Sequence, residues 1–269
     1  NFMQRFCGYC LTGDTSESIV AMFWGGGSNG KSTLIDIIDY ILGDYAMTTP
    51  FGTVLQGDKG SKGGGDATPD LARLPGARFV SAAEPDTGAR LSEGAVKKVT
   101  GSDVLPARHL NKDFFEYVPQ FKLVLSFNNK PYIRGQDEGI WRRLILIPFE
   151  QRFVDAELLD KNPHAKPKIK NLDKAMRKEA SGILNWMLDG YRLWAETGLK
   201  IPEKIRAITD EYRQDSNPIY DFISSWCVRD PKGTIQAKRC FTAYKLWCSD
   251  NGVDPISFTA FGTWIKDMN

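Results

Sequence analysis

One stretch decides the fold of this chain: Gly25-Gly26-Gly27-Ser28-Asn29-Gly30-Lys31-Ser32-Thr33. The apolar run SIVAMFW (18–24) before it predicts a buried strand, and residues 31–42 after it place their apolar side chains on one helical face. A strand, a glycine-rich turn and a helix are the context that the pattern GxxxxGK(S/T) requires. Glycines let backbone N–H groups close around phosphates, and the helix N-terminus adds its positive dipole end. The stretch therefore predicts a nucleoside triphosphate site, with Lys31 on the β and γ phosphates and Ser32 on Mg²⁺.

The composition is that of an ordinary globular protein. Of the 269 residues, 42% are hydrophobic and 25% are charged, and the net charge of +2 excludes no class of partner. No apolar run approaches the roughly 20 residues of a membrane span, so we expect no membrane segment. The five cysteines are scattered, which favours a reducing cytoplasm over a disulfide framework. Cys7-x-x-Cys10 lacks a second pair at zinc spacing, which disfavours a metal site. Because Asn1 is not an initiator Met, we expect a piece of a longer protein.

Further strands alternate with helical stretches in the first 150 or so residues. The candidate strands are 78–83, 121–127 and 144–149. Strands that alternate with helices predict an α/β fold with a parallel sheet covered on its faces. One long helix is expected at 171–196. Three short helices are expected at 220–228, 238–251 and 259–268, the last capped by Ser257.

The pattern predicts four parts in the chain. They are an N-terminal helical segment (1–14), a P-loop core (15–155), a helical lid or linker (156–205) and a helical module of winged-helix type (206–269). A small helical bundle without a nucleic-acid role fits the last part nearly as well. The basic run at 161–178 is compatible with a solvated helix face as well as with a partner site.

Two polar residues follow candidate strands at positions that suit hydrolysis. Glu84 follows residues 78–83, where a carboxylate can hold Mg²⁺ through water or polarise the attacking water. Asn128 follows residues 121–127, where an amide can orient the water or sense the γ-phosphate. The alternatives are an exposed acid before Pro85 and an asparagine in a turn.

The pair Arg142–Arg143 precedes the strand at 144–149. Paired arginines are often surface charges, but an arginine supplied by a neighbouring subunit can accelerate hydrolysis on the order of 10³–10⁵-fold. A kinase of a small metabolite would not need such an arginine.

In their order along the chain, these motifs resemble those of superfamily 3 helicases. The most similar branch is the phage and plasmid primase–helicases, which are related to the poxvirus primase–helicases. The resemblance covers nearly the whole chain and is carried by GGGSNGKST (25–33), FVSAAEPD (79–86), KKVTGSDVLPARHLNKDFFEY (97–117), KLVLSFNNKP (122–131), GIWRRLILIPF (139–149) and EASGILNW (179–186).

The resemblance implies an AAA+-like ATPase core that forms a hexamer, uses ATP and Mg²⁺, and threads one DNA strand through its channel. It implies work on single-stranded or forked DNA in phage or plasmid replication, in the cytoplasm, with a primase domain in the same full-length chain. Glycines 25, 26, 27 and 30 with Ser28, Asn29 and Thr33 then complete the ATP loop around Lys31 and Ser32.

The same resemblance assigns the remaining catalytic roles. Glu84 matches the Walker B acid and, with Ser32, the metal site; Asn128 matches the sensor. The pair Arg142–Arg143 contains the arginine finger, and which of the two acts is left open. Many members carry two adjacent acids where this chain has Glu84-Pro85, so Asp86 is a second candidate for the catalytic base.

The segment 97–117 matches the part of the family that carries a pore hairpin. It combines cations with Phe114, Phe115 and Tyr117, as sequence-independent binding of single strands requires. The expected DNA-binding residues are Lys97, Lys98, Arg108, His109 and Lys112. A basic surface loop packed by core aromatics is the plain alternative.

Two other functions are compatible with the phosphate loop. A small-metabolite kinase would be a monomer whose ATPase ignores DNA. A non-motor initiator module would bind DNA, with nucleotide locking an assembly, but would not unwind it.

Overall fold

The computed structural model describes residues 1–55, 68–83, 90–133, 137–228, 230, 233–253 and 255–267. The chain divides into two compact units, Asn1–Thr209 and Asp210–Asn269. No helix in the described ranges is long and apolar enough to cross a membrane.

The first unit is built on a parallel five-stranded sheet with the order β2-β3-β6-β1-β7. The strands are β1 (Val20–Trp24), β2 (Ala46–Thr48), β3 (Phe79–Ala83), β6 (Lys122–Phe127) and β7 (Leu144–Pro148). The four strands predicted from sequence are thereby confirmed, and β2 is an additional short edge strand. Although β6 is distant from β1 in sequence, it pairs directly with it and separates it from β3. This crossover places the end of β6 beside the glycine-rich stretch.

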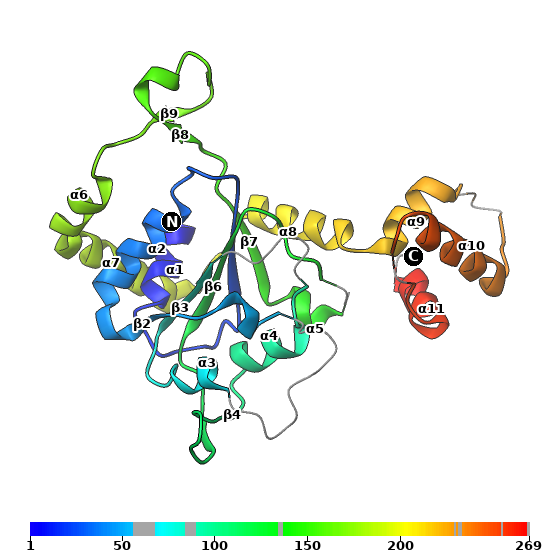
Figure 1. Ribbon diagram of the computed structural model, residues 1–269, viewed down its shortest axis with the longest axis horizontal. Helices are drawn as coiled ribbons and strands as arrows, with labels where there is room; N and C mark the ends of the chain where they lie inside the picture. Colours follow the sequence, from blue (N-terminus) through cyan, green and yellow to red (C-terminus); the bar gives the residue numbers. More distant parts are fainter. Residues whose placement is uncertain are drawn as a thin grey trace. The chain divides into compact units, whose positions relative to one another are not determined.

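Helices cover the sheet. Helix α2 (Lys31–Leu42) has the predicted bounds, and with α1 (Phe2–Tyr9) and α7 (Ala180–Thr197) it packs on one face around Phe6, Phe23 and Ile38. Helix α4 (Glu93–Thr100) packs against β6, and Figure 1 shows it on the other side of the sheet from α1 and α2. Strand β6 is buried throughout, as expected for a strand covered on both faces.

Helices α1 and α7 cross closely because two glycines meet. A Cβ on Gly8 would lie 2.0 Å from the Tyr191 backbone nitrogen, and one on Gly190 would lie 1.9 Å from the Gln4 carbonyl oxygen. Arg5, buried on α1, donates to Thr197 Oγ1 at 2.8 Å and to the Gly198 carbonyl at 3.0 Å. A cation at the C-terminus of α7 also complements its helix dipole.

The single helix expected at 171–196 is instead two helices. Helix α6 (Leu172–Lys178) ends before Glu179, whose φ of −95° and ψ of 9° interrupt the helical path to α7. The reason is tertiary, because α6 packs against α2 whereas α7 lies along α1. Only the last part of the basic run at 161–178 is helical, with Lys174, Arg177 and Lys178 on α6, so its basic residues do not share one continuous helical face.

Short elements connect the larger ones. They are the 3-10 turns η1 (Gly43–Tyr45), η2 (Phe51–Thr53) and η3 (Ala156–Leu158), the helices α3 (Pro69–Ala72) and α5 (Glu138–Trp141), the hairpin strands β4 (Leu105–Ala107) and β5 (Phe115–Tyr117), and the two-residue strands β8 (Phe153–Val154) and β9 (Lys166–Pro167). The stretch 52–66 is rich in Gly, Lys and Asp, which predicts a loop, and most of it lies outside the described residues.

The second unit is helical. Helix α8 (Glu203–Asp215) contains the division point, and α9 (Pro218–Trp226), α10 (Ala237–Asp250) and α11 (Phe258–Asp267) follow. They enclose a core that includes Phe222, Tyr244 and Phe261. The Ser257 hydroxyl accepts from the Ala260 backbone N–H at 3.2 Å, which confirms the predicted cap. No strand occurs in the described part of this unit, and the winged-helix assignment stays a prediction.

Candidate nucleotide site and arginine edge

The glycine-rich stretch forms a loop at the carboxyl end of β1. Gly25, Ser28 and Gly30 all have positive φ, at 154°, 61° and 88°. A Cβ on Gly25 would lie 2.5 Å from both Asn29 Nδ2 and the Phe149 carbonyl oxygen, so glycine is required there. A Cβ on Gly26 or Gly27 would meet nothing within 4 Å. The loop is therefore fixed at Gly25, whereas its crown, Gly26 and Gly27, has open space for a phosphate chain.

The loop lysine is buried beneath this crown. Lys31 Nζ donates to the Gly25 carbonyl at 2.5 Å, to Asn29 Oδ1 at 3.2 Å and to Asn128 Oδ1 at 3.1 Å. Asn128 is 97 residues away in sequence and arrives because β6 lies next to β1. The structure thus places Lys31 and Asn128, two of the predicted site residues, in direct contact.

Sequence reasoning missed the contact by which Trp24 holds Asn128 and the one by which Asn29 holds the loop. Trp24 Nε1 donates to the Asn128 carbonyl at 3.1 Å, and Lys130 Nζ lies 4.5 Å from the Trp24 ring centroid. Asn29, assigned only as a loop residue, also donates through Nδ2 to the Phe149 carbonyl at 3.1 Å. No local sequence signal marks these contacts, because each joins the ends of different strands.

The two hydroxyl residues of the motif point to different surroundings. Ser32 is exposed on the first turn of α2, so its hydroxyl is accessible to a ligand. Thr33 instead lines a mostly apolar cavity of about 400 Å³, together with Ser28, Gly30, Leu34, Phe153, Lys168, Ile169, Leu172 and Met176.

Phe153 forms one wall of this cavity and is fixed to the loop. Its backbone N–H donates to the Ser28 carbonyl at 2.7 Å. Its ring edge lies 4.0 Å from where a Cβ on Gly30 would stand. An aromatic ring against an apolar hollow beside a phosphate loop suits a nucleoside base. Sequence reasoning did not predict this residue.

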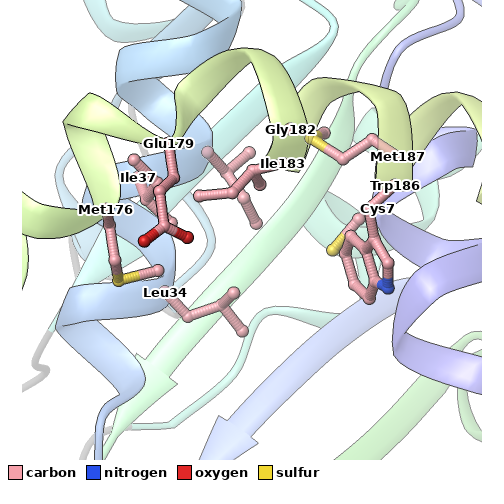
Figure 2. A pocket seen from close by; sticks show the side chains of 10 residues that line it. Cys7, Leu34, Ile37, Met176, Glu179, Gly182, Ile183, Trp186 and Met187 are labelled. Atoms are coloured by element: carbon pink, nitrogen blue, oxygen red, sulfur yellow. The ribbon is translucent and has the colours of Figure 1, made fainter.

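A second apolar hollow of about 380 Å³ lies where α2 meets α6 and α7, and Leu34 and Met176 line both hollows. Figure 2 shows its lining, with the Glu179 carboxylate among apolar side chains that include Ile183. The helices that cover the sheet therefore also shape the surroundings of the loop.

The predicted acids Glu84 and Asp86 lie outside the described residues. The structure describes β3 up to Ala83, which pairs with Ser126 of β6. The carboxyl end of β3 is thus one strand away from that of β1. The roles of Glu84 in catalysis and in metal binding stay predictions.

The arginine pair lies at the amino ends of the strands, whereas the loop lies at their carboxyl ends. Strand β7 begins at Leu144, which pairs with Val20 at the start of β1, and the Val20 N–H donates to the Arg143 carbonyl at 2.7 Å. The loop follows Trp24, at the other end of β1. Strands of this length span roughly 17–20 Å, so neither arginine side chain is positioned to serve its own loop.

The two arginines differ in exposure. Arg142 is exposed. Arg143 is half-buried and donates to the Gly139 carbonyl at 2.5 Å, and its Nε has no hydrogen-bond partner among the described residues. Arg142 is thus available to another molecule, whereas Arg143 is engaged within the chain.

Strands β4 and β5 form an antiparallel hairpin in which Ala107 pairs with Phe115. Residues 109–114 at its tip are exposed, with Leu110 at 71% and Phe114 at 50%. The Arg108 guanidinium lies 4.7 Å from the Phe114 ring centroid, and the His109 ring stacks on Phe115 at 5.8 Å. Figure 1 shows the hairpin projecting from the lower end of this unit. Arg108, His109 and Lys112 are thereby grouped at or beside one protruding tip.

The other two predicted DNA-binding residues lie elsewhere, on α4. Lys98 is exposed. Lys97 Nζ contacts both carboxylate oxygens of Asp137, at 2.9 Å and 3.0 Å. The structure therefore separates Lys97 from the hairpin tip and joins it to the segment that leads into the arginine pair.

The chain is similar in sequence to known viral proteins. Residues 214–269 match the family described as Poxvirus D5 protein-like. The chain is 31% identical over 251 residues to "Putative helicase L207/L206" of Acanthamoeba polyphaga mimivirus, covering 90% of this chain and 26% of that protein. It is 28% identical over 264 residues to "Putative helicase 022R" of Frog virus 3, covering 93% of this chain and 26% of that protein.

The chain is a relative of the superfamily 3 primase–helicases. Its fold is similar to the apo structure of the NrS-1 C-terminal region, with a TM-score of 0.53 and 12% identity, covering 78% of this chain and 46% of that one. The D5-like match falls within the second unit, Asp210–Asn269, whereas the viral relatives align with most of both units. This superfamily 3 relative spans about a quarter of the length of those viral proteins.

Proposed function

We propose that this chain is the ATP-hydrolysing motor portion of a DNA helicase. The observation that carries the proposal is the contact between Lys31 Nζ and Asn128 Oδ1 at 3.1 Å, under a loop with an open crown. It brings a phosphate-binding cation and a polar amide to one point at the carboxyl ends of β1 and β6. Ligands bind at such points in open parallel sheets.

The residues present fit Mg-ATP. Lys31 would neutralise charge on the β and γ phosphates, and the exposed Ser32 hydroxyl would hold the metal together with Glu84. When bound, Mg²⁺ supplies charge that stabilises the leaving phosphate. Asn128 would orient the attacking water, and Glu84, or Asp86 in its place, would accept the proton of that water.

The position of Arg142 and Arg143 supports a shared active site. An exposed Arg142 at the amino end of β7 suits the nucleotide of a neighbouring subunit, since its own loop lies at the far end of the strand. Heterologous contacts of this kind form a ring when the rotation between subunits closes, and we propose a hexamer. The hairpin tip, also on the amino side of the sheet, would then face DNA in the ring channel.

We further propose that the whole protein acts in DNA replication of a phage or plasmid, on single-stranded or forked DNA, with a primase domain in the same chain. The decisive test is the ATPase rate with and without single-stranded DNA, measured beside the mass from light scattering. A DNA-stimulated ATPase in a multimer, with displacement of a labelled strand, supports the motor. A monomer that ignores DNA would indicate a small-molecule kinase, and a DNA-bound multimer without unwinding would indicate an initiator module.

The hairpin tip provides a specific prediction. His109→Ala with Lys112→Ala should preserve ATPase without DNA, because the tip lies far from the loop, but should abolish DNA stimulation and strand separation. The affinity for single strands falls as salt rises, and each lost phosphate contact should reduce the magnitude of that log–log slope by about 0.7. An exposed pair on α7, Asp189–Arg192, provides the control variant Arg192→Ala. A tip variant that unwinds DNA like the wild type, with an unchanged salt slope, would place the DNA path elsewhere.

The apolar cavity provides a second prediction. Phe153→Ala should weaken ATP binding by on the order of 1–3 kcal/mol, the value of stacking a base on an aromatic ring. The effect should appear in KM with kcat nearly unchanged, because stacking is the same in ground and transition states. Phe153→Tyr keeps the ring and should retain most of the affinity. An unchanged KM for Phe153→Ala would show that the base lies outside this cavity.

A further inference from the structure

Lys97 was expected to contact DNA, but its surroundings indicate another role. Its ammonium lies between both carboxylate oxygens of Asp137, at 2.9 Å and 3.0 Å. Asp137 directly precedes α5, at its N-cap position. Burial of the Asp137 carboxyl would raise its pKa, but the hydrogen bond and charge of Lys97 and the nearby backbone N–H groups lower it. The carboxylate is therefore charged at neutral pH and bound to α4.

Helix α5 is short and is held at both ends. Ile140 and Trp141 are buried. At its end, Arg143 donates to the Gly139 carbonyl, and the Arg143 carbonyl accepts from Val20 of β1. At its start, a Cβ on Gly139 would lie 2.7 Å from Asp137 Oδ1 and 3.4 Å from Lys97 Nζ. The ion pair thus lies directly against Gly139, and a Cβ at this position would force the Asp137 carboxylate to shift.

We propose that Lys97 is a positioning residue: through Asp137 it orients α5 so that Arg142 is presented to the nucleotide of a neighbouring subunit. This inference rests on the proposed function. Arg142 follows α5 directly, and its backbone N–H donates to the Glu138 carbonyl at 3.1 Å. A rotation of α5 therefore moves Arg142. Because α4 also leads into the hairpin through Gly101, the same ion pair connects the DNA-binding segment to the arginine.

The pair is exposed enough that its loss should not unfold the protein. The side chains of Lys97 and Asp137 are 37% and 51% exposed, and such pairs add little stability. Lys97→Ala should lower Tm by no more than about 4 °C. It should nevertheless lower kcat of the ATPase by roughly 10- to 100-fold, because small misplacements of a group that acts in the transition state are costly. KM for ATP should stay unchanged, since the arginine acts on the transition state.

The test compares Lys97→Ala, Asp137→Asn and the double variant with Arg192→Ala, which breaks an exposed pair with the same 2.9 Å separation. Both single variants should lose kcat equally, the double variant should lose no more, and Arg192→Ala should behave as wild type. The exchanged pair Lys97→Asp with Asp137→Lys should recover part of kcat. If a single variant is insoluble, the exchanged pair decides: partial recovery supports the inference, and a folded but inactive exchanged pair overturns it.

DNA binding separates this role from a direct contact. The salt slope of single-strand binding should be unchanged in Lys97→Ala, whereas Lys112→Ala should lower it by about 0.7. A lower slope in Lys97→Ala with normal behaviour of Asp137→Asn would make Lys97 a DNA contact and overturn the inference. Full ATPase in Arg142→Ala would instead refute the shared active site itself. Loss in Arg142→Ala with full activity in Lys97→Ala would refute only the positioning role.

Discussion

Lys31→Ala should abolish ATP hydrolysis, with a loss at least on the order of the 10²–10³-fold that follows removal of one charge-stabilising donor. The ammonium is buried at 5% exposure and is surrounded by the oxygens of Gly25, Asn29 and Asn128. It is thus positioned before nucleotide arrives, and alanine leaves no cation beneath the open crown of the loop. Steady-state phosphate release measures the effect.

The fold should survive this change, because α2 is held by its apolar face rather than by Lys31. Circular dichroism and Tm check this, and Lys204→Ala, which removes a cation from an exposed ion pair with Glu150, is the matched control. Substantial hydrolysis in Lys31→Ala, with the fold intact, would mean that the glycine-rich loop is not the catalytic phosphate site.

Arg142→Ala should lower ATPase on the order of 10³-fold or more, within the range that an arginine supplied in trans contributes. Arg143→Ala should have a smaller effect, because its guanidinium is bound to the Gly139 carbonyl and acts through α5. The physical reason is the position of the pair at the amino end of β7, a strand length of roughly 17–20 Å away from the loop of the same subunit.

Mixing distinguishes an action in trans from a local defect. Lys31→Ala subunits carry an intact arginine, and Arg142→Ala subunits carry an intact loop. In rings assembled from equal amounts of the two variants, half of the loops and half of the arginines are intact. About a quarter of the interfaces therefore combine an intact loop with an intact arginine. ATPase should therefore reappear in the mixture although each parent is inactive. No recovery in rings shown to contain both subunits would contradict a shared site.

Contiguous residues were sufficient to predict the core of the candidate nucleotide site. The strand before Gly25, the loop and the helix from Lys31 to Leu42 were all predicted, because apolar periodicity and glycine's access to positive φ are local properties. The other three predicted strands were confirmed for the same reason, since strands covered on both faces appear as short apolar runs. Ser257 could be identified as a cap because its hydroxyl bonds to a backbone group only three residues away.

Tertiary structure alone decided which of these pieces meet. The insertion of β6 between β1 and β3 brings Asn128 to Lys31, and strand order is set by packing over the whole sheet rather than by any local pattern. The break at Glu179 arises in the same way, because α6 packs mainly against α2 whereas α7 packs mainly along α1. Lys97 was grouped by sequence with the hairpin cations, yet in space it meets Asp137, 40 residues away. A charge in a sequence does not identify its partner, and only the fold determines which group lies within about 3 Å of it.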